Sequence, residues 1–356
     1  MDKKIVLTGG GTAGHVTPNL ALVPALTEKG FSITYIGSLN GIEKNLVEEK
    51  NIEYYGIATG KFRRYFDPKN FSDPFRVIKG YFQAKKLLKK IKPDVLFSKG
   101  GFVSVPVIRA AASLKIPCII HESDMTPGLA NKLCAPVAKK ICCNFPETFE
   151  MIPANKAVLT GSPIRQEILQ GDKEAGKALC GFSDDKPVML VVGGSQGSAA
   201  INGAIRDSLQ TLLKTFNIVH LTGKDKVDNL LLTIPGYKQF EYISDEMKDL
   251  FALADIVVSR AGANAICELL ALHKPNLLIP LPAGSSRGDQ ILNAASYEEQ
   301  GFSMVLNEED MTSKLLIETI NNLYENRDKF IENMTSTNQK DAISAIIDLI
   351  MDEVKA

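Results

Sequence analysis

The chain has 356 residues, of which 45% are hydrophobic and 23% are charged, a balance that excludes a disordered or fibrous protein. Lys and Arg together number 41, as do Asp and Glu, so the net charge is zero and a bulk polycation that coats nucleic acid is excluded as well. At about 150 residues per domain, this length predicts two domains with separate cores.

The amino-terminal segment does not have the pattern of an export signal. Its apolar run, residues 5–7, is shorter than a signal peptide requires, and no stretch approaches the roughly 18 consecutive apolar residues of a transmembrane helix. The cysteines form neither a C-x-x-C pair nor a zinc spacing, which predicts reduced, buried thiols in a cytosolic protein. They are Cys118, Cys134, Cys142, Cys143, Cys180 and Cys267.

Short apolar, β-branched runs alternate with helical stretches along the whole chain. This alternation predicts right-handed βαβ units and therefore an α/β fold with parallel sheets. Two such series predict two Rossmann-like, doubly wound domains. In the first half we expect strands at about 4–8, 32–37, 52–57, 94–98, 117–120, 139–143 and 157–160. In the second half we expect them near 187–192, 217–222, 238–243, 255–259, 276–280 and 303–306.

The segment 161–165 marks the expected domain boundary, because it follows one strand series and precedes a charged helix. We therefore expect an amino-terminal domain over 1–162 and a carboxy-terminal domain over 163–339. The last stretch, about 340–356, has the apolar spacing of an amphipathic helix. It can pack back on the first domain.

Three glycine-rich loops follow predicted strands directly, at 9–14, 99–104 and 193–198. In a parallel α/β sheet, ligands bind at the carboxyl ends of the strands. Glycine lets the backbone approach a phosphate closely, and the next helix offers unpaired N–H groups and a partial positive charge. Tight turns alone would explain one such loop, but three loops in two domains favour anion binding. Two domains of this kind fit a reaction between two diphosphate compounds.

Residues 9–14 also match the G-x-G-x-x-G pattern of dinucleotide-binding folds. That site needs an acid about 20 residues further on, at the end of the second strand. Here the strand ends Gly37-Ser38, so a nicotinamide or flavin cofactor is disfavoured. No G-x-x-x-x-G-K-[ST] phosphate loop and no D-x-D metal clamp occurs either. We expect no cofactor and no metal, so cations and helix ends would balance the charge of a bound diphosphate.

Six motifs follow one another along the chain and together resemble the MurG family of bacterial cell-wall N-acetylglucosaminyltransferases. The resemblance runs to about residue 306 and implies a glycosyltransferase B fold, in which two domains face a cleft. It implies inverting transfer of GlcNAc from UDP-GlcNAc to the C4 hydroxyl of MurNAc in undecaprenyl-diphospho-MurNAc-pentapeptide (lipid I). The product would be lipid II of peptidoglycan synthesis. The motifs are Gly10–His15, Lys99–Ser104, His121–Asp124, Gly161–Arg165, Gly193–Gly197 and Asp289–Asn293.

The resemblance also implies roles for single residues. Arg165 would bind the diphosphate through its planar guanidinium, although an interdomain salt bridge is the alternative. Glu268 would accept hydrogen bonds from the ribose diol, although the helix dipole also favours an acid early in a helix. Gln290, with Asp289 beside it, resembles the contact to the GlcNAc hydroxyls.

The complete implied site has a donor set and an acceptor set. Two of its residues depart from the family pattern: Ala13 stands where many members have Gly, and Asp124 where many have Asn. The donor set is Thr12, Ala13, Gly14, Asp124, Arg165, Ser195, Ile243, Ala263, Glu268 and Gln290. The acceptor set is Gly11, Gly100, Gly101, His121 and Glu122.

Of the four histidines, only His15 follows a glycine loop of this kind. A neutral imidazole there could act as the general base, a charged one could bind the acceptor diphosphate, and a structural cap is the third interpretation. We take His15 as the catalytic residue. His121 ends another strand and is expected on the acceptor side, whereas His220 is expected in the core and His273 on the surface.

Residues 61–92 hold eleven Lys and Arg against two Asp, so this segment has a charge of +9 and the rest of the chain −9. Seven aromatic residues lie among them. Each cation near an anionic surface contributes about 1 kcal/mol, which predicts peripheral binding to the cytoplasmic face of the membrane. We expect the aromatic loop 62–75 at the lipid. The alternative, a helix with a solvated basic face, is compatible with this. Its inward side would be Val77, Ile78, Tyr81, Ala84, Leu88 and Ile91.

Three other functions share parts of this pattern. A lipid glycosyltransferase acting on diacylglycerol would share the donor domain, and a UDP-GlcNAc 2-epimerase of the same fold would need no basic patch. A protein that binds the nucleotide sugar without turnover is the third. The expected partners are UDP-GlcNAc, lipid I, the anionic membrane and other cell-wall synthesis proteins. Nucleic acid is not expected, because no recognition motif supports it.

Overall fold

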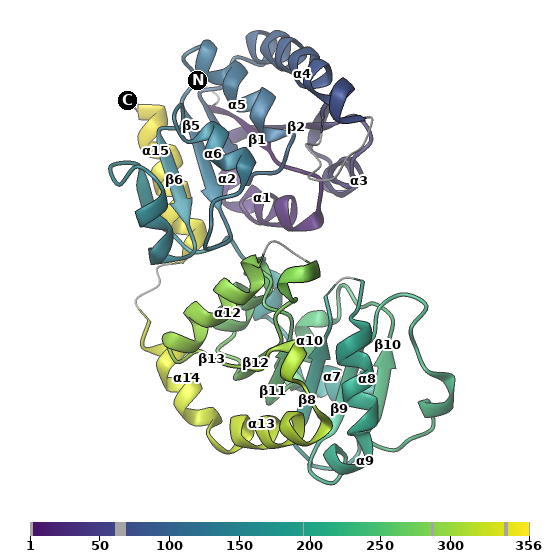
Figure 1. Ribbon diagram of the computed structural model, residues 1–356. Coiled ribbons are helices and arrows are strands. Elements are labelled where there is room, and N and C mark those ends of the chain that lie inside the picture. The colour runs from purple at the N-terminus through teal and green to yellow at the C-terminus, as the bar shows by residue number, and fades with distance from the viewer. Residues whose placement is uncertain (1–2, 61–68, 195, 286–287, 338–340, 356) are drawn as a thin grey trace. The chain divides into compact units, whose positions relative to one another are not determined.

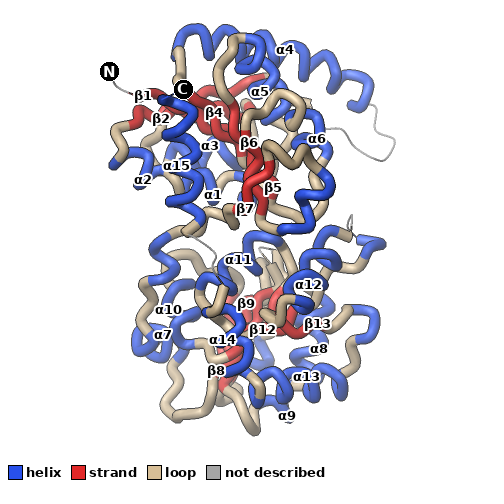
Figure 2. The backbone as a smooth tube through the Cα atoms, turned by 90° about the vertical axis from the view of Figure 1, so that its left-hand side faces the viewer, coloured by secondary structure: helices blue, strands red, loops and turns tan. Residues whose placement is uncertain are grey.

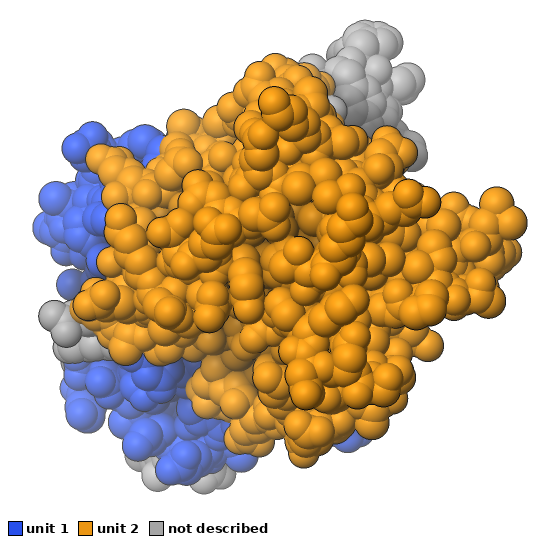
Figure 3. Space-filling model, turned by 90° about the horizontal axis from the view of Figure 1, so that it is seen from below, with its two compact units in different colours: residues 1–165, 339–356 blue, residues 166–338 orange. Residues whose placement is uncertain are grey.

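The computed structural model describes residues 3–60, 69–194, 196–285, 288–337 and 341–355. The chain divides into two compact units, which Figure 3 colours separately. Unit 1 comprises residues 1–165 and 339–356, and unit 2 comprises residues 166–338. Each unit contains one parallel sheet covered by helices, so the predicted α/β fold with two doubly wound sheets is confirmed.

The sheet of unit 1 has seven strands in the order β3-β2-β1-β4-β5-β6-β7. Every neighbouring pair is parallel, and each strand overlaps a range that the sequence predicted. The strands are β1 (Lys3–Thr8), β2 (Phe31–Ser38), β3 (Glu53–Ile57), β4 (Val95–Ser98), β5 (Cys118–Glu122), β6 (Lys140–Cys143) and β7 (Ala157–Leu159).

Helices cover both faces of this sheet (Figure 2). One group is α1 (Thr17–Ala21), α2 (Val23–Glu28), α3 (Ile42–Glu48) and α15 (Ala342–Lys355). The other is α4 (Lys69–Ile91), α5 (Ser104–Ser113) and α6 (Leu129–Cys134). Short 3-10 turns are η1 (Ala13–His15) and η2 (Pro146–Met151).

The two helix groups pack on alternate residues of the strands. On β1, Ile5 and Leu7 belong to the apolar cluster of the first group, whereas Val6 belongs to that of the second. Successive side chains of a strand point to opposite faces, so a strand covered on both sides reads as a continuous apolar run. This is why the runs were visible in the sequence as strands.

Helix α15 comes from the end of the chain and packs in unit 1, beside α2 (Figure 1). Its isoleucines Ile343, Ile346, Ile347 and Ile350 are buried in the cluster that also contains Leu26. Their spacing of three and four residues places them on one side of the helix. The end of the chain therefore completes the core of the first unit.

The sheet of unit 2 has six parallel strands in the order β10-β9-β8-β11-β12-β13. They are β8 (Val188–Val192), β9 (Asn217–Leu221), β10 (Tyr237–Phe240), β11 (Ile256–Ser259), β12 (Asn276–Leu278) and β13 (Ser303–Val305). The helices are α7 (Lys173–Cys180), α8 (Ala199–Asp207), α9 (Leu209–Leu212), α10 (Met247–Leu253), α11 (Ala263–Ala271), α12 (Asp289–Glu299), α13 (Ser313–Glu325) and α14 (Arg327–Thr335). The 3-10 turns are η3 (Gln166–Leu169), η4 (Asn229–Leu231), η5 (Ala283–Ser285) and η6 (Glu308–Asp310).

Two further expectations about the core are confirmed. All six cysteines are buried as free thiols. His220 is fully buried between Tyr237 and Asn202, and burial lowers its pKa to about 3, whereas His273 is exposed.

The basic segment differs from its prediction in two respects. From residue 69 the segment is helix α4, where the aromatic loop was expected to continue to residue 75, and residues 61–68 lie outside the described part of the chain. Ala84 and Leu88 pack inward as predicted, but Ile78 is 55% exposed. Ala84 and Leu88 define the inward side of the helix, and at about 3.6 residues per turn Ile78 lies to one side of it.

Candidate active site

A buried carboxylate lies beneath the first glycine loop of unit 1. Glu43, in the first turn of α3, is fully buried. Its carboxylate accepts hydrogen bonds from the Ser38 N–H (2.9 Å), the Ser38 hydroxyl (2.5 Å) and the Gly11 N–H (3.3 Å). A Cβ at Gly10 or Gly37 would collide with this side chain. The loop is therefore built around an anion supplied by the protein itself.

Glu43 was missed in the sequence, where an acid was sought at the end of the second strand. It lies five residues beyond Ser38, inside the next helix. The signal in the sequence was the pair of glycines Gly37 and Gly41. Both lack a Cβ and so leave room for the Glu43 side chain. Because backbone amides already bind its oxygens, Glu43 is not presented to a ribose.

The predicted base, His15, ends the turn η1 and is partly exposed. Its Nδ1 lies 3.0 Å from Thr12 Oγ1. When Nδ1–H donates to that hydroxyl, the lone pair remains on Nε2. The ring lies against the second glycine loop, where a Cβ at Gly100 would be 3.5 Å from His15 Cδ2. Gly101, with φ +84°, lets this loop pass over the carbonyl of Gly10.

The remaining residues predicted in the first loop lie at its surface. Gly11, Thr12 and Ala13 are exposed, and Gly14 is partly exposed within η1. Both glycine loops of unit 1 thus meet at one edge of the sheet, as expected for neighbouring strands β1 and β4.

Lys99 is buried at the same edge. Its Nζ donates to His121 Nδ1 (2.8 Å), Ser123 Oγ (2.7 Å) and Ser162 Oγ (3.0 Å). An ammonium group can only donate, so Nδ1 of His121 accepts, and the other ring nitrogen donates to the Gly161 carbonyl at 2.8 Å. Burial and the Lys99 charge hold the pKa of His121 well below its ordinary value. His121 is therefore a neutral imidazole with one defined tautomer.

Glu122 binds the turn that follows β5. Its carboxylate accepts from the N–H groups of Ser123 (2.9 Å), Asp124 (3.2 Å) and Gly128 (2.9 Å), and from the Asn131 amide (2.9 Å). Burial raises the pKa of Glu122, while the Asn131 amide and backbone N–H groups oppose the shift. Like His121, Glu122 is buried and bonded within the protein, so its contact with the acceptor stays a prediction. Asp124 is partly exposed.

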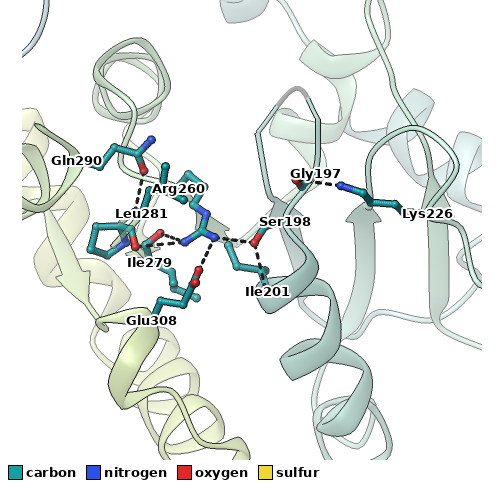
Figure 4. A network of polar contacts seen from close by, with 10 residues as sticks. Gly197, Ser198, Ile201, Lys226, Arg260, Ile279, Leu281, Gln290 and Glu308 are labelled. Atoms are coloured by element: carbon teal, nitrogen blue, oxygen red, sulfur yellow. Dashed lines mark hydrogen bonds and ion pairs between the residues drawn. The ribbon is translucent and has the colours of Figure 1, made fainter. Parts of the chain in front are cut away.

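The glycine loop of unit 2 is held by cations (Figure 4). Lys226, itself exposed, donates to the carbonyls of Gln196 (2.7 Å) and Gly197 (3.4 Å). Gly197, with φ +67°, packs against the end of β9, where a Cβ would collide with the Thr222 carbonyl. Ser198 then caps α8 by accepting from the Ile201 N–H at 3.3 Å.

A single guanidinium connects this loop to the two neighbouring strand ends. Arg260, after β11, donates to Ser198 Oγ (2.7 Å) and to the Ile279 carbonyl (3.0 Å), and it forms an ion pair with Glu308. It is only 9% exposed. The sequence contained Arg260 in a strand-end segment but did not reveal this role, because its partners lie 19, 48 and 62 residues away along the chain.

The predicted donor residues of unit 2 lie around the same edge. Ala263 is the first residue of α11, and Glu268 is partly exposed on that helix. Gln290, on α12, accepts a hydrogen bond from the Leu281 N–H at 3.0 Å, and its nitrogen points away from Leu281 (Figure 4). Ile243 is partly exposed after β10. Ser195 lies outside the described residues.

Arg165 is the last residue of unit 1 and is partly exposed. Its Nε is buried and has no hydrogen-bond partner among the residues that the structure describes. A buried guanidinium nitrogen normally has an acceptor. Binding of a diphosphate by Arg165 stays a prediction.

One surface of α4 is both apolar and basic. Phe75 (74% exposed), Ile78 and Phe82 (63% exposed) recur at helical spacing. Exposed cations accompany them on the helix, namely Arg76, Lys79, Lys86, Lys89 and Lys90. Within the described residues, no helix combines the length and the apolarity that crossing a bilayer requires. The same described residues contain no group of three or more His, Cys, Asp or Glu side chains arranged to hold a metal ion.

Models of protein families match both halves of the chain. The glycosyltransferase family 28 N-terminal domain matches residues 5–143, and the glycosyltransferase family 28 C-terminal domain matches residues 188–350.

Individual relatives match over nearly their whole length. A protein of Lachnospira eligens is 64% identical over 353 residues, which cover 99% of this chain and 100% of the relative. It is named UDP-N-acetylglucosamine--N-acetylmuramyl-(pentapeptide) pyrophosphoryl-undecaprenol N-acetylglucosamine transferase. A protein of the same name from Lachnoclostridium phytofermentans is 60% identical, with 98% of each chain covered. Among solved structures, MurG of Acinetobacter baumannii matches with a TM-score of 0.79 and 28% identity over 98% of this chain and 99% of that one.

Proposed function

This chain belongs to glycosyltransferase family 28, among its UDP-N-acetylglucosamine–N-acetylmuramyl-(pentapeptide) pyrophosphoryl-undecaprenol N-acetylglucosamine transferases. From this premise we propose which residues bind each substrate and which residue acts as the base. The enzyme transfers GlcNAc from UDP-GlcNAc to the C4 hydroxyl of MurNAc in lipid I, with inversion, and forms lipid II. The proposal assigns the donor to unit 2 and the acceptor and the membrane to unit 1.

The observation that carries the donor assignment is the charge around the two glycine loops. The loop of unit 2 has the exposed ammonium of Lys226 on its carbonyls and the start of α8 directly after it. The first loop of unit 1 instead packs on the Glu43 carboxylate. The ammonium and the helix start favour a diphosphate at the loop of unit 2, whereas Glu43 occupies the Gly11 N–H that could otherwise bind the UDP diphosphate. The diphosphate therefore binds at residues 193–198, which include Ser195.

Glu268 and Gln290 complete the donor site. A carboxylate on α11 accepts hydrogen bonds from the ribose diol, and Ala263 at the start of this helix lies beside the nucleotide, as does Ile243. Gln290 uses its oxygen on the Leu281 N–H, which leaves its amide nitrogen to donate to a GlcNAc hydroxyl. Arg165 stabilises the negative charge that develops on the diphosphate as the bond to the sugar breaks.

His15 is the general base. With Nδ1–H donated to Thr12, Nε2 takes the proton of the MurNAc C4 hydroxyl. The hydroxyl oxygen then forms a bond to C1 of GlcNAc from the face opposite UDP, and the C1–oxygen bond to UDP breaks with its electron pair. Thr12, Ala13, Gly14 and Asp124 contact the transferred sugar from unit 1. Gly11, Gly100, Gly101, His121 and Glu122 shape the acceptor side.

Helix α4 attaches the enzyme to the anionic, cytoplasmic face of the membrane. Its exposed Phe75, Ile78 and Phe82 enter the interface while the adjacent lysines meet lipid phosphates. This keeps unit 1 next to a lipid-linked acceptor. Other cell-wall synthesis proteins are further expected partners.

Turnover with defined acceptors tests the proposal. The purified protein is incubated with radiolabelled UDP-GlcNAc and either lipid I or diacylglycerol in anionic vesicles. We expect label in a product of lipid I alone. Transfer to diacylglycerol would assign a different acceptor, and release of an epimerised sugar nucleotide without acceptor would overturn the transferase assignment.

A further inference from the structure

Lys99 joins three strand-end segments of unit 1 at one buried ammonium group. It follows β4 directly and is 1% exposed. Its Nζ donates to His121 at the end of β5, to Ser123 in the turn after it, and to Ser162 beyond β7. An ammonium group only donates, so each of these partners accepts from Lys99.

Each segment also carries a residue that the proposed function uses. Gly100 follows Lys99 in the chain and lies against the ring of His15. A Cβ at Gly100 would be 3.5 Å from His15 Cδ2. Asp124 follows Ser123, and Arg165 comes three residues after Ser162. Lys99 itself is covered by these segments and contacts them rather than solvent.

The direction of the hydrogen bonds around Lys99 allows only one tautomer of His121. Because Lys99 only donates, His121 must accept at Nδ1 and donate from Nε2 to the Gly161 carbonyl. Gly161 has φ +71°, a conformation that favours glycine and turns the chain toward Arg165. The ammonium therefore determines the orientation of the His121 ring and, through it, the position of the backbone at Gly161.

We propose that Lys99 is a positioning residue for glycosyl transfer, which sets the spacing between the Gly100 loop, the Asp124 turn and the Ser162–Arg165 segment. This inference rests on the proposed function. Lys99 acts through these three segments and does not touch the substrates. Misplacement by about 1 Å of groups that orient a reaction can cost on the order of 100-fold in rate, so the effect belongs mainly to kcat.

Lys99→Met tests the proposal, because it keeps the length of the side chain and removes all three donors. Lys44→Met is the matched control, since Lys44 is an exposed lysine of unit 1 on α3. Turnover of UDP-GlcNAc and lipid I is measured together with the KM of each substrate. We expect Lys99→Met to lower kcat on the order of 100-fold with a smaller change in either KM, and Lys44→Met to match the unmodified enzyme.

Nitrogen NMR of the imidazoles supplies a readout that general destabilisation would not move. In the unmodified protein we expect His121 as the Nε2–H tautomer with a hydrogen-bonded Nδ1, and in Lys99→Met a shifted Nδ1 resonance while His220 and His273 keep theirs. An unchanged His121 spectrum, or a kcat equal to that of Lys44→Met, would overturn the proposal. Absence of transfer to lipid I by the unmodified protein would instead overturn the proposed function.

Should Lys99→Met not fold, Ser123→Ala, Ser162→Ala and the double variant decide the question. Residues that act through one group have non-additive effects. We expect each single variant to lower kcat and the double variant to lower it by a factor different from the product of the two. Exactly multiplicative losses, or none, would show that no shared ammonium positions the two segments.

Discussion

The glycine loops of units 1 and 2 follow the central strands β1 and β8 of equivalent sheets, yet opposite charges hold them. Counted from the first strand of each unit, the two sheets share the strand order 3-2-1-4-5-6. In unit 1 the Glu43 carboxylate accepts the N–H of Gly11, whereas in unit 2 Lys226 donates to the carbonyl of Gly197. The topology therefore decides where a glycine loop lies, and the charge packed against it decides which ligands it favours.

The sharpest way to test this division is to remove the base that we assign to unit 1. His15→Ala should lower kcat by about 10²- to 10⁴-fold, the usual contribution of a general base, with little change in the KM for UDP-GlcNAc. His273→Ala, an exposed histidine of unit 2, is the control. Steady-state kinetics with lipid I in vesicles measures both. Near-normal turnover of His15→Ala would remove it from catalysis.

Membrane attachment should also belong to unit 1 alone. Replacing Lys86 and Lys89 with Gln removes two exposed cations of α4, each worth about 1 kcal/mol near an anionic surface, so binding should weaken about 30-fold. The same change at Lys314 and Lys329 of unit 2, both exposed, is the control. Sedimentation with anionic and neutral vesicles measures this. Equal recovery of the unmodified protein with both lipids would contradict an electrostatic attraction between α4 and anionic lipid.

Glu43→Gln should distinguish a structural anion from a ligand site. The amide keeps the shape but places an N–H donor among the amides that now donate to the carboxylate, which should cost about 1–3 kcal/mol of unfolding free energy. Denaturant unfolding measures that loss, with the exposed Glu48→Gln as the control. We expect the KM for UDP-GlcNAc to stay unchanged. A weaker donor interaction in Glu43→Gln would mean that this loop, too, binds the nucleotide.

The smallest effect is expected at the loop of unit 2. Lys226→Met removes an exposed cation, whose interactions are worth up to about 1 kcal/mol, so the Kd for UDP should rise about 2- to 5-fold and less at high salt. Lys224→Met, an exposed neighbour, should change it less. Titration calorimetry with UDP across a salt series measures both. A salt-independent affinity equal in the two variants would contradict a diphosphate at this loop.

The sequence alone determined the strands, the glycine loops and the kind of core. Each strand is a short apolar run bounded by turn residues, and all thirteen expected runs are strands in the structure. His220 and the six cysteines were identified as buried because they lie within such runs or their helices. These properties are local, so the residue order is sufficient to show them.

Only the tertiary structure revealed Glu43, Lys99 and Arg260 as the residues that hold the strand-end loops. Their hydrogen-bond partners come from other strands, as with Lys99 and Ser162, which are separated by 63 residues. It also corrected Ile78, because the inward side of α4 depends on the sheet beneath the helix. Burying a charge is costly unless specific partners surround it, and those partners meet only when the chain has folded.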